Sequence, residues 1–365
     1  MSVSSLPFLH GALAAVLPKL AAWRRDFHAH PEAGWTEFRT AALIIRRLRE
    51  LGYAIRMGEA ACASDRRMGV PSSAVLAAAR ERALEHGADA ELVGGMGDGY
   101  TGFWADLDCG PGPVTAFRFD MDCNEVAECA EESHRPVREG FASRWPGLMH
   151  ACGHDGHAAV GLGLAEVLVS IRRHLRGRIR LIFQPAEEGA RGALPMSEAG
   201  AVDGVDVLFG FHIGFKAEGP GSLICGTQGF LATTKRDVLF SGVPAHAGAA
   251  PEEGKDALLA ACSAVVNLHA ISRNGKGGTR IAVGRLEGGE ARNVIPASAR
   301  LFMETRGETT ELDAYMTAES ERILRASADL WGCACEWRTV GNSAGGGSSP
   351  ELARLIATVA EAMGG

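Results

Sequence analysis

The segment over residues 149–157 gathers several potential metal ligands in a short stretch of chain. Three histidines, a cysteine and an aspartate fall within eight residues, beside small glycines and just before a predicted helix. Thiolates and imidazoles bind divalent cations such as zinc, and Gly153 tolerates a backbone geometry that lets Cys152 and His154 turn toward one point. No second Cys/His pair follows at the spacing of a zinc finger. The segment therefore predicts a ligand cluster that is not a zinc finger.

Two adjacent carboxylates form a second feature with chemical potential. Glu187 and Glu188 follow a predicted buried strand at residues 178–183, and catalytic loops of α/β sheets lie at the carboxyl ends of strands. Adjacent like charges repel unless a cation or a proton intervenes. A solvated loop is the alternative interpretation. The functional interpretation is that one carboxylate binds a metal while its neighbour moves the protons of a water.

Three further polar residues follow apolar runs. His212 closes the run at residues 205–212, where a simply packed histidine is the alternative. Asp120 and Asp122 follow the predicted strand at residues 114–119, and we expect them to orient metal ligands. Because all of these residues follow predicted strands of one sheet, they can converge on a single crevice.

Alternating helices and strands must position these residues. The sequence predicts helices over residues 36–51, 72–85 and 156–174, between the apolar runs already named. Buried strands covered by helices are typical of an α/β domain with a largely parallel sheet. We therefore expect the first part of the chain to form such a domain.

The pattern changes from about residue 234 onward. It predicts a strand, a helix, two strands, a helix and a strand, over residues 237–241, 256–271, 280–286, 299–305, 310–326 and 334–340. This β-α-β-β-α-β order is that of a ferredoxin-like unit. A glycine-rich linker at 341–349 and one helix at 350–363 follow, and a single helix must pack on an existing domain. We therefore expect a catalytic domain of residues 1–230 plus 345–365, with a second domain inserted at residues 231–344.

Composition limits the partners and the compartment. The 365-residue chain has a net charge of −7, which argues against nucleic acid or an anionic membrane as a partner. No apolar run approaches the roughly 20 residues that span a bilayer, and residues 1–11 lack the pattern of a signal peptide. Nine scattered cysteines suit free thiols in a reducing compartment. The expected location is the cytoplasm, and the expected ligand is a small molecule.

Three motifs carry a resemblance to a known enzyme family. They are Met-His-Ala-Cys-Gly-His-Asp-Gly-His at residues 149–157, Phe-Gln-Pro-Ala-Glu-Glu-Gly at 183–189 and Ala-Arg-Asn-Val-Ile-Pro at 291–296. They resemble the hippurate hydrolase and auxin-conjugate hydrolase group of di-metal amidohydrolases, in the aminoacylase/carboxypeptidase superfamily. Segments at 23–28, 34–40, 65–100 and 133–136 are similar more specifically to the p-aminobenzoyl-glutamate hydrolase branch. The similarity covers nearly the whole chain.

The resemblance implies a fold and a set of site residues. The fold would be α/β: a di-metal peptidase-like catalytic domain with an inserted ferredoxin-like α+β domain that serves as a lid and dimerisation surface. The residues that match the metal ligands of the family are Cys152, His154, Glu188 and His212, and Glu187 matches its catalytic base. The residues of the inserted domain that match substrate contacts are His246, Asn293 and Arg306. His246 would act across a dimer.

The resemblance also implies a reaction, its cofactors and its partners. Two divalent cations are expected, with Mn²⁺ as the implied metal, although a thiolate ligand by itself favours Zn²⁺. The expected reaction is hydrolysis of the amide bond of a carboxylated N-acyl amino acid, with p-aminobenzoyl-glutamate as the substrate and p-aminobenzoate and glutamate as products. The expected partner is a second copy bound through the lid domain, or a related second subunit.

Other functions stay open at this point. Cys152 could be the nucleophile of a thiol hydrolase, with a nearby histidine as its base. The chain could also be a non-catalytic binding or regulatory subunit, or act on another N-acyl amino acid. Members of the family supply a last metal-ligating histidine near the C-terminus, whereas no histidine follows His269 here. We therefore expect an incomplete metal site and weak activity in the 365-residue chain on its own.

Overall fold

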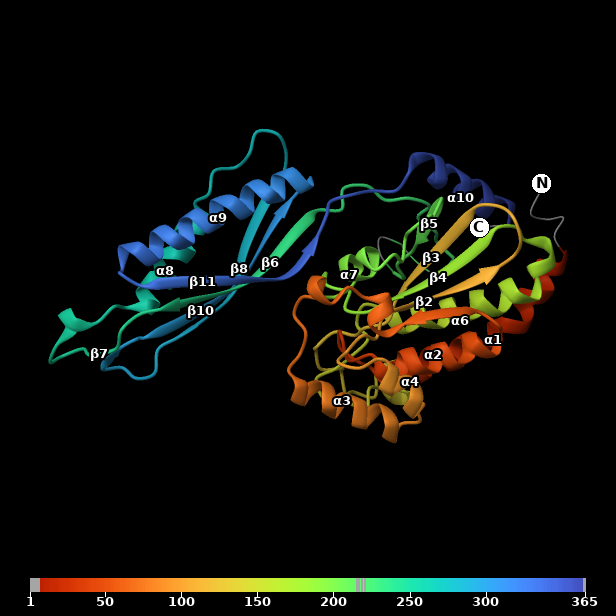
Figure 1. Ribbon diagram of the computed structural model, residues 1–365, viewed down its shortest axis with the longest axis horizontal. Helices are drawn as coiled ribbons and strands as arrows, with labels where there is room; N and C mark the ends of the chain where they lie inside the picture. Colours follow the sequence, from red (N-terminus) through yellow and green to blue (C-terminus); the bar gives the residue numbers. More distant parts are fainter. Residues whose placement is uncertain (1–6, 215–216, 218, 220, 364–365) are drawn as a thin grey trace. The chain divides into compact units, whose positions relative to one another are not determined.

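The structure, a computed structural model, describes residues 7–214, 217, 219 and 221–363 (Figure 1). The chain divides into two compact units: the first ends at Ile224 and resumes at Ile356, and the second runs from Cys225 to Leu355. The beginning of the segment that lacks a signal-peptide pattern, residues 1–6, lies outside the described residues. No helix among the described residues is long and apolar enough to cross a membrane.

The first unit is built on a five-stranded sheet with the strand order β1-β2-β4-β3-β5. Its strands are β1 (Ala54–Met57), β2 (Phe103–Asp108), β3 (Val114–Asp120), β4 (Arg178–Gln184) and β5 (Val207–Gly210). Strands β4, β3 and β5 are parallel, as predicted, but β1 and β2 are antiparallel additions. The connection from β2 to β3 at residues 109–113 is too short for a parallel crossover of about a dozen residues. The expectation of a largely parallel sheet is therefore correct only for the three strands that carry the site.

Helices cover both faces of this sheet. The helices of the first unit are α1 (Pro7–Ala29), α2 (Phe38–Glu50), α3 (Ser73–Glu85), α4 (Ala90–Gly95), α5 (Arg135–Arg138), α6 (His154–Ser170) and α7 (Ala193–Glu198). Helices α2 and α6 bury the larger core, to which the sheet contributes Phe103 and Phe183. The side chain of Trp104 points to the opposite face and packs near α7, because successive side chains alternate along a strand. The predicted helices over 36–51, 72–85 and 156–174 are confirmed as α2, α3 and α6.

The second unit is an antiparallel sheet with two helices on one face (Figure 1). Its long elements are β6 (Ala232–Ser241), α8 (Ala257–His269), β8 (Thr279–Gly288), β10 (Ser298–Gly307), α9 (Thr310–Leu330) and β11 (Ala334–Ser343). The strand order is β11-β6-β10-β8, so the predicted β-α-β-β-α-β unit is confirmed. Strand β11 continues to Ser343, and the linker predicted from residue 341 therefore begins too early. The last helix is α10 (Pro350–Ala362).

Candidate metal centre and active site

The predicted metal-site residues of the first unit come together at one edge of the sheet. Asp120 ends β3, Glu187 and Glu188 follow β4, and His212 follows β5. These three strands are parallel, so their carboxyl ends lie at the same edge. His154 is the first residue of α6 and is fully buried.

Backbone geometry at the start of α6 aims the first two ligands. Gly153 is the residue before the helix and has a left-handed backbone with φ of 85°, which is costly for a residue with a Cβ atom. Cys152 on one side of this turn places its Sγ atom 3.3 Å from Nε2 of His212. The glycine that the sequence singled out therefore lies where the chain has to turn.

His154 is positioned to offer one ring nitrogen to a cation. Its Nδ1–H donates a hydrogen bond to the backbone carbonyl of Asp122 at 2.8 Å, which leaves Nε2 as the free ligand atom of the neutral ring. Nε2 is buried and has no hydrogen-bond partner among the described residues. It lies 3.7 Å from Oε2 of Glu187 and 3.9 Å from Oε1 of Glu188. A buried lone pair that faces two carboxylates is an arrangement that a divalent cation would complete.

The ligand atoms form overlapping groups that share His154. One group is Cys152, His154 and His212, and another is His154, Glu187 and Glu188; within each group the ligand atoms lie within 4.8 Å of one another. The mixed sulfur, nitrogen and oxygen donors suit a transition-metal ion. The residues present therefore fit a metal centre, and two groups around a shared histidine have room for more than one ion.

Asp122 and Asp120 surround the ligands and contact them directly. A carboxylate oxygen of Asp122 accepts the backbone N–H of Glu188 at 3.0 Å, so this residue holds two ligands at once. Asp120 lies 3.2 Å from Nδ1 of His157 and forms an ion pair with Arg118. These contacts fit the orienting role predicted for both aspartates. His157 was not singled out as an orienting residue, because its partner on the loop before His212 is far away in sequence: its Nε2 accepts the backbone N–H of Ile213 at 3.0 Å.

Glu37 is a site residue that the sequence did not reveal. It is fully buried, and its carboxyl group accepts the backbone N–H of Ala186 at 2.8 Å and the hydroxyl of Thr101 at 2.6 Å. Ala186 directly precedes Glu187 and has a left-handed backbone with φ of 49°, a conformation that costs free energy in a residue other than glycine. The only signal in the sequence is that Glu37 belongs to the 34–40 segment, one of those that carry the narrower resemblance.

The site is rich in carboxylates, and this changes the acidity of its groups. Burial and the charge of Asp120 raise the pKa of Glu187 to about 7. Burial and the nearby Glu188 raise the pKa of the Cys152 thiol to about 12. Burial alone would lower the pKa of His154, but its hydrogen bond to Asp122 and the charge of Asp120 raise it to about 9. All three directions reflect excess negative charge, which bound cations would compensate.

A pocket of about 400 Å³ opens beside Cys152. Its lining includes Arg24 and His28 from one of the segments that carry the narrower resemblance, and His134 and Arg135 from another. His28 is fixed within it, 2.9 Å from both Asp155 and Glu128. The two segments, about a hundred residues apart in sequence, therefore line one pocket together with a predicted metal ligand.

The remaining predicted residues lie in the second unit, at opposite ends of its sheet. His246, in β7 (Ala245–His246), pairs with Val294 of β9 (Val294–Ile295), and the carbonyl of Asn293 accepts the N–H of Ala247 at 3.0 Å. Arg306 is near the far end of β10, eight positions from Ser298, the first residue of that strand. At about 3.3 Å per residue, this is roughly 26 Å of strand. The structure thus brings His246 and Asn293 together and separates both from Arg306.

His246 presents one defined hydrogen-bond donor. Its Nδ1 accepts the backbone N–H groups of Gly248 and Ala249, each at 3.1 Å. Because Nδ1 acts as an acceptor, the proton of the neutral ring is on Nε2. His246 can therefore donate a hydrogen bond to a ligand from Nε2.

Sequence comparisons identify relatives over most of the chain. Residues 116–365 match the model of Peptidase family M20/M25/M40. Indole-3-acetyl-aspartic acid hydrolase from Enterobacter agglomerans is 46% identical over 94% of this chain and 79% of that protein. One of the subunits of p-aminobenzoyl-glutamate hydrolase from Escherichia coli (strain K12) is 45% identical over 96% of this chain and 80% of that protein.

Solved structures share the fold. The aminobenzoyl-glutamate utilization protein from Klebsiella pneumoniae is 41% identical with a TM-score of 0.82, over 95% of this chain and 81% of that chain. A dinuclear metal-binding peptidase of the M20 family from Bacillus subtilis is 25% identical with a TM-score of 0.59, over 96% of this chain and 81% of that chain. The fold class and the resemblance drawn from the motifs are both confirmed.

Proposed function

Because this chain belongs to Peptidase family M20/M25/M40, we propose that it is a metal-dependent amidohydrolase acting on p-aminobenzoyl-glutamate. The products would be p-aminobenzoate and glutamate, which places the enzyme in the breakdown of folate fragments. The observation that carries the proposal is the buried Nε2 of His154, which faces Glu187 and Glu188 without a hydrogen-bond partner among the described residues.

The chain's own residues can hold the cofactor that such chemistry needs. Cys152, His154, Glu188 and His212 would bind two divalent cations, with the thiolate as a candidate bridge between them. When bound, the cations would polarise the amide carbonyl and lower the pKa of a water. The resemblance favours Mn²⁺, and the thiolate favours Zn²⁺. Elemental analysis of the purified protein distinguishes the two.

Glu187 is the proposed proton carrier. It accepts a proton from the attacking water while the water oxygen adds to the amide carbon. It then delivers this proton to the nitrogen as the C–N bond breaks, so that a free amine and a carboxylate leave. A carboxyl group with a pKa near the working pH can do both, and burial together with Asp120 raises the pKa of Glu187 to about 7 in the metal-free chain.

The second unit would supply contacts to the substrate. His246 would donate from Nε2 to the developing oxyanion, with Asn293 beside it, and Arg306 would bind a substrate carboxylate through its planar guanidinium. The separation of His246 from Arg306 supports a dimer, because a small substrate cannot touch both ends of one copy of this sheet. We propose that His246 comes from a partner copy bound through the second unit. A related but different chain is the alternative partner, since the relative from Escherichia coli is named as one of several subunits.

The acyl half and the compartment complete the proposal. The pocket beside Cys152 is the proposed site of the p-aminobenzoyl group, because the segments that set the narrower resemblance line it. All nine cysteines are free thiols, which supports a cytoplasmic location.

Turnover and metal dependence test this function together. Purified protein is loaded with Mn²⁺ or Zn²⁺, and release of p-aminobenzoate from p-aminobenzoyl-glutamate is followed by chromatography. Hydrolysis should stop after treatment with a chelator and return when metal is added back. Hydrolysis that resists the chelator but is lost on alkylation of Cys152 would show a thiol hydrolase instead. Tight substrate binding with no turnover by the metal-loaded protein would show a binding subunit.

A further inference from the structure

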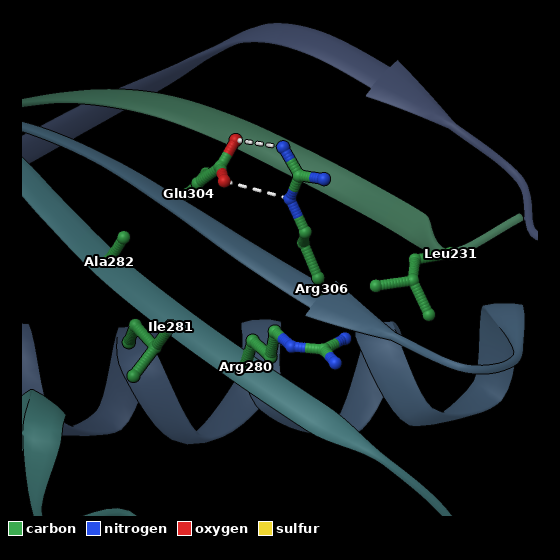
Figure 2. Close-up of a pocket in the computed structure, with 6 residues that line it drawn as sticks. All are labelled: Leu231, Arg280, Ile281, Ala282, Glu304 and Arg306. Carbon is green, nitrogen blue, oxygen red and sulfur yellow. Dashed lines mark hydrogen bonds and ion pairs between the residues drawn. The ribbon is translucent and has the colours of Figure 1, made fainter. Parts of the chain in front are cut away.

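Two arginines face each other across neighbouring strands of the second unit. In the register of β10 and β8, Arg306 is directly opposite Arg280, and Figure 2 shows both side chains at the same end of the sheet. Arg280 is exposed, and the side chain of Arg306 is 42% exposed. Like charges directly opposite on paired strands repel. An anionic ligand beside them would relieve this repulsion.

The two arginines line a pocket of about 460 Å³. Leu231, Ala282 and Glu304 contribute to the same pocket (Figure 2). Leu231 and Ala282 provide apolar surface, so the polar chemistry of the pocket comes from two guanidinium groups and one carboxylate. Its formal charge is therefore positive by one unit, in a protein whose net charge is −7.

The single carboxylate is already engaged by one of the arginines. Glu304 accepts two hydrogen bonds from Arg306, from Nε at 2.7 Å and from Nη2 at 3.2 Å (Figure 2). The guanidinium of Arg280 makes no hydrogen bond or ion pair within the described part of the chain. Its donors are therefore available to a ligand, and Glu304 holds the neighbouring guanidinium in a fixed orientation.

The ligand chemistry that fits two adjacent guanidinium groups is a pair of carboxylates. A planar guanidinium binds a carboxylate through two parallel hydrogen bonds, and directly opposed residues on paired strands have Cβ atoms only about 5 Å apart. Glutamate and aspartate in amide linkage carry two carboxylates joined by a short carbon chain. Two relatives are named for conjugates of these amino acids, one for indole-3-acetyl-aspartic acid and one for p-aminobenzoyl-glutamate.

We propose that Arg280 binds the side-chain carboxylate of the amino-acid half of the substrate, next to Arg306 on the α-carboxylate. This inference rests on the proposed function and adds a specificity determinant to it. Arg280 would make the enzyme selective for conjugates of glutamate and aspartate over conjugates of neutral amino acids. A substrate with an uncharged side chain would leave the guanidinium of Arg280 without its partner.

The test compares two substrates that differ by one charge. p-Aminobenzoyl-glutamate and p-aminobenzoyl-glutamine have nearly the same shape, but only the first has a side-chain carboxylate. Arg280→Gln should lower kcat/KM for the glutamate substrate by about 10- to 100-fold, the effect of one charge-assisted hydrogen-bonded contact. It should change kcat/KM for the glutamine substrate by less than about threefold. Arg280→Lys, which keeps the charge but loses the planar fork, should fall between Arg280→Gln and the unmodified protein.

Arg285→Gln is the matched control. Arg285 is an exposed arginine of the same strand, and it lies outside the residues that line the pocket. This variant should keep the preference for the glutamate substrate. Thermal unfolding of all variants identifies any loss that comes from a damaged fold.

The outcomes separate this inference from the proposed function. An equal loss for both substrates in Arg280→Gln, or no preference in the unmodified protein, would overturn the role of Arg280 while hydrolysis itself stands. If the metal-loaded protein hydrolyses neither substrate, the proposed function fails and binding of both compounds is measured by calorimetry. A glutamate preference in Kd that disappears in Arg280→Gln would still support the site. Equal Kd values for the two compounds would overturn it.

Discussion

The carboxyl group of Glu37 accepts the backbone N–H of Ala186 at 2.8 Å, one residue before Glu187. This bond joins the start of α2 to the turn that carries the two active-site carboxylates. It holds Ala186 in its left-handed conformation, with φ of 49°. Burial and the charge of Asp122 raise the pKa of Glu37 to about 8, so this group is mostly neutral at pH 7. Glu37 therefore acts as a positioning residue through its oxygen atoms and not through a charge.

The neutral state of Glu37 leads to a contrast between two substitutions. Glu37→Gln keeps an oxygen for the N–H of Ala186 and removes no charge at pH 7, so kcat should stay within a few-fold of the unmodified protein. Glu37→Ala removes the acceptor and should lower kcat by about 100-fold, the cost of displacing a reacting group by about 1 Å. The measurement is kcat beside the melting temperature. Equal damage from both variants would show that Glu37 acts as a charged carboxylate.

The separation of His246 from Arg306 leads to a complementation experiment. Inactive His246→Ala and inactive Glu187→Gln subunits are mixed under conditions that exchange subunits. Half of the dimers should be hybrids with one intact site of two, so that about a quarter of the full activity returns. Mixing Glu187→Gln with Glu188→Gln is the control and should restore nothing, because every first unit is then defective. Mixtures that exchange subunits and stay inactive would contradict a role for His246 across the dimer.

An ion pair between α1 and α2 gives the folded chain a defined pH dependence. Arg39 donates two hydrogen bonds to Asp26, at 2.9 and 3.0 Å. Burial raises the pKa of Asp26, but the hydrogen bonds from His30 and Arg39 outweigh it and hold the pKa at about 2, below the ordinary 3.8. A carboxyl group with a lowered pKa stabilises the fold above its unfolded-state pKa. That contribution is lost as the pH falls from about 4 toward 2.

Asp26→Asn should therefore lower the free energy of unfolding at pH 7 by about 0.5 to 1 kcal/mol. The estimate is kept small because solvent screens a pair that is partly exposed. Urea unfolding of both proteins at pH 7 and about pH 2.5 measures the difference, which should shrink at the lower pH. Asp65→Asn is the control, since Asp65 makes only an exposed pair with Arg66. A difference that is the same at both pH values would exclude the ionic contribution of Asp26.

Local sequence patterns were enough to predict the helices, the parallel strands and the convergence of the site. Cys152, Glu187 and His212 each follow an apolar run, and the carboxyl ends of parallel strands share one edge of a sheet. The antiparallel strands β1 and β2 were missed, because their direction depends on pairing with β4 and not on their own residues. Glu37 was missed for the same reason: its partner Ala186 is 149 positions away.

The position of Arg280 is also beyond the reach of sequence patterns. Strand β8 pairs with β10 through a register shift between Phe302 and Met303. A slip of one residue would move a side chain to the other face of the sheet, and a bulge changes which residues lie opposite. The pairing of Arg280 with Arg306 therefore becomes visible only once the register of the two strands is known.

The exchange of Glu187 and Glu188 for glutamine, one at a time, tests the assigned roles most directly. Each variant is analysed for bound metal and for release of p-aminobenzoate. Glu187→Gln should keep its metal and lose turnover by about 10²- to 10⁴-fold, since it removes a proton carrier and not a ligand. Glu188→Gln should lose metal. If Glu187→Gln loses metal while Glu188→Gln retains it, the two roles are reversed. If neither change affects metal content or turnover, a metal centre built on these carboxylates is contradicted.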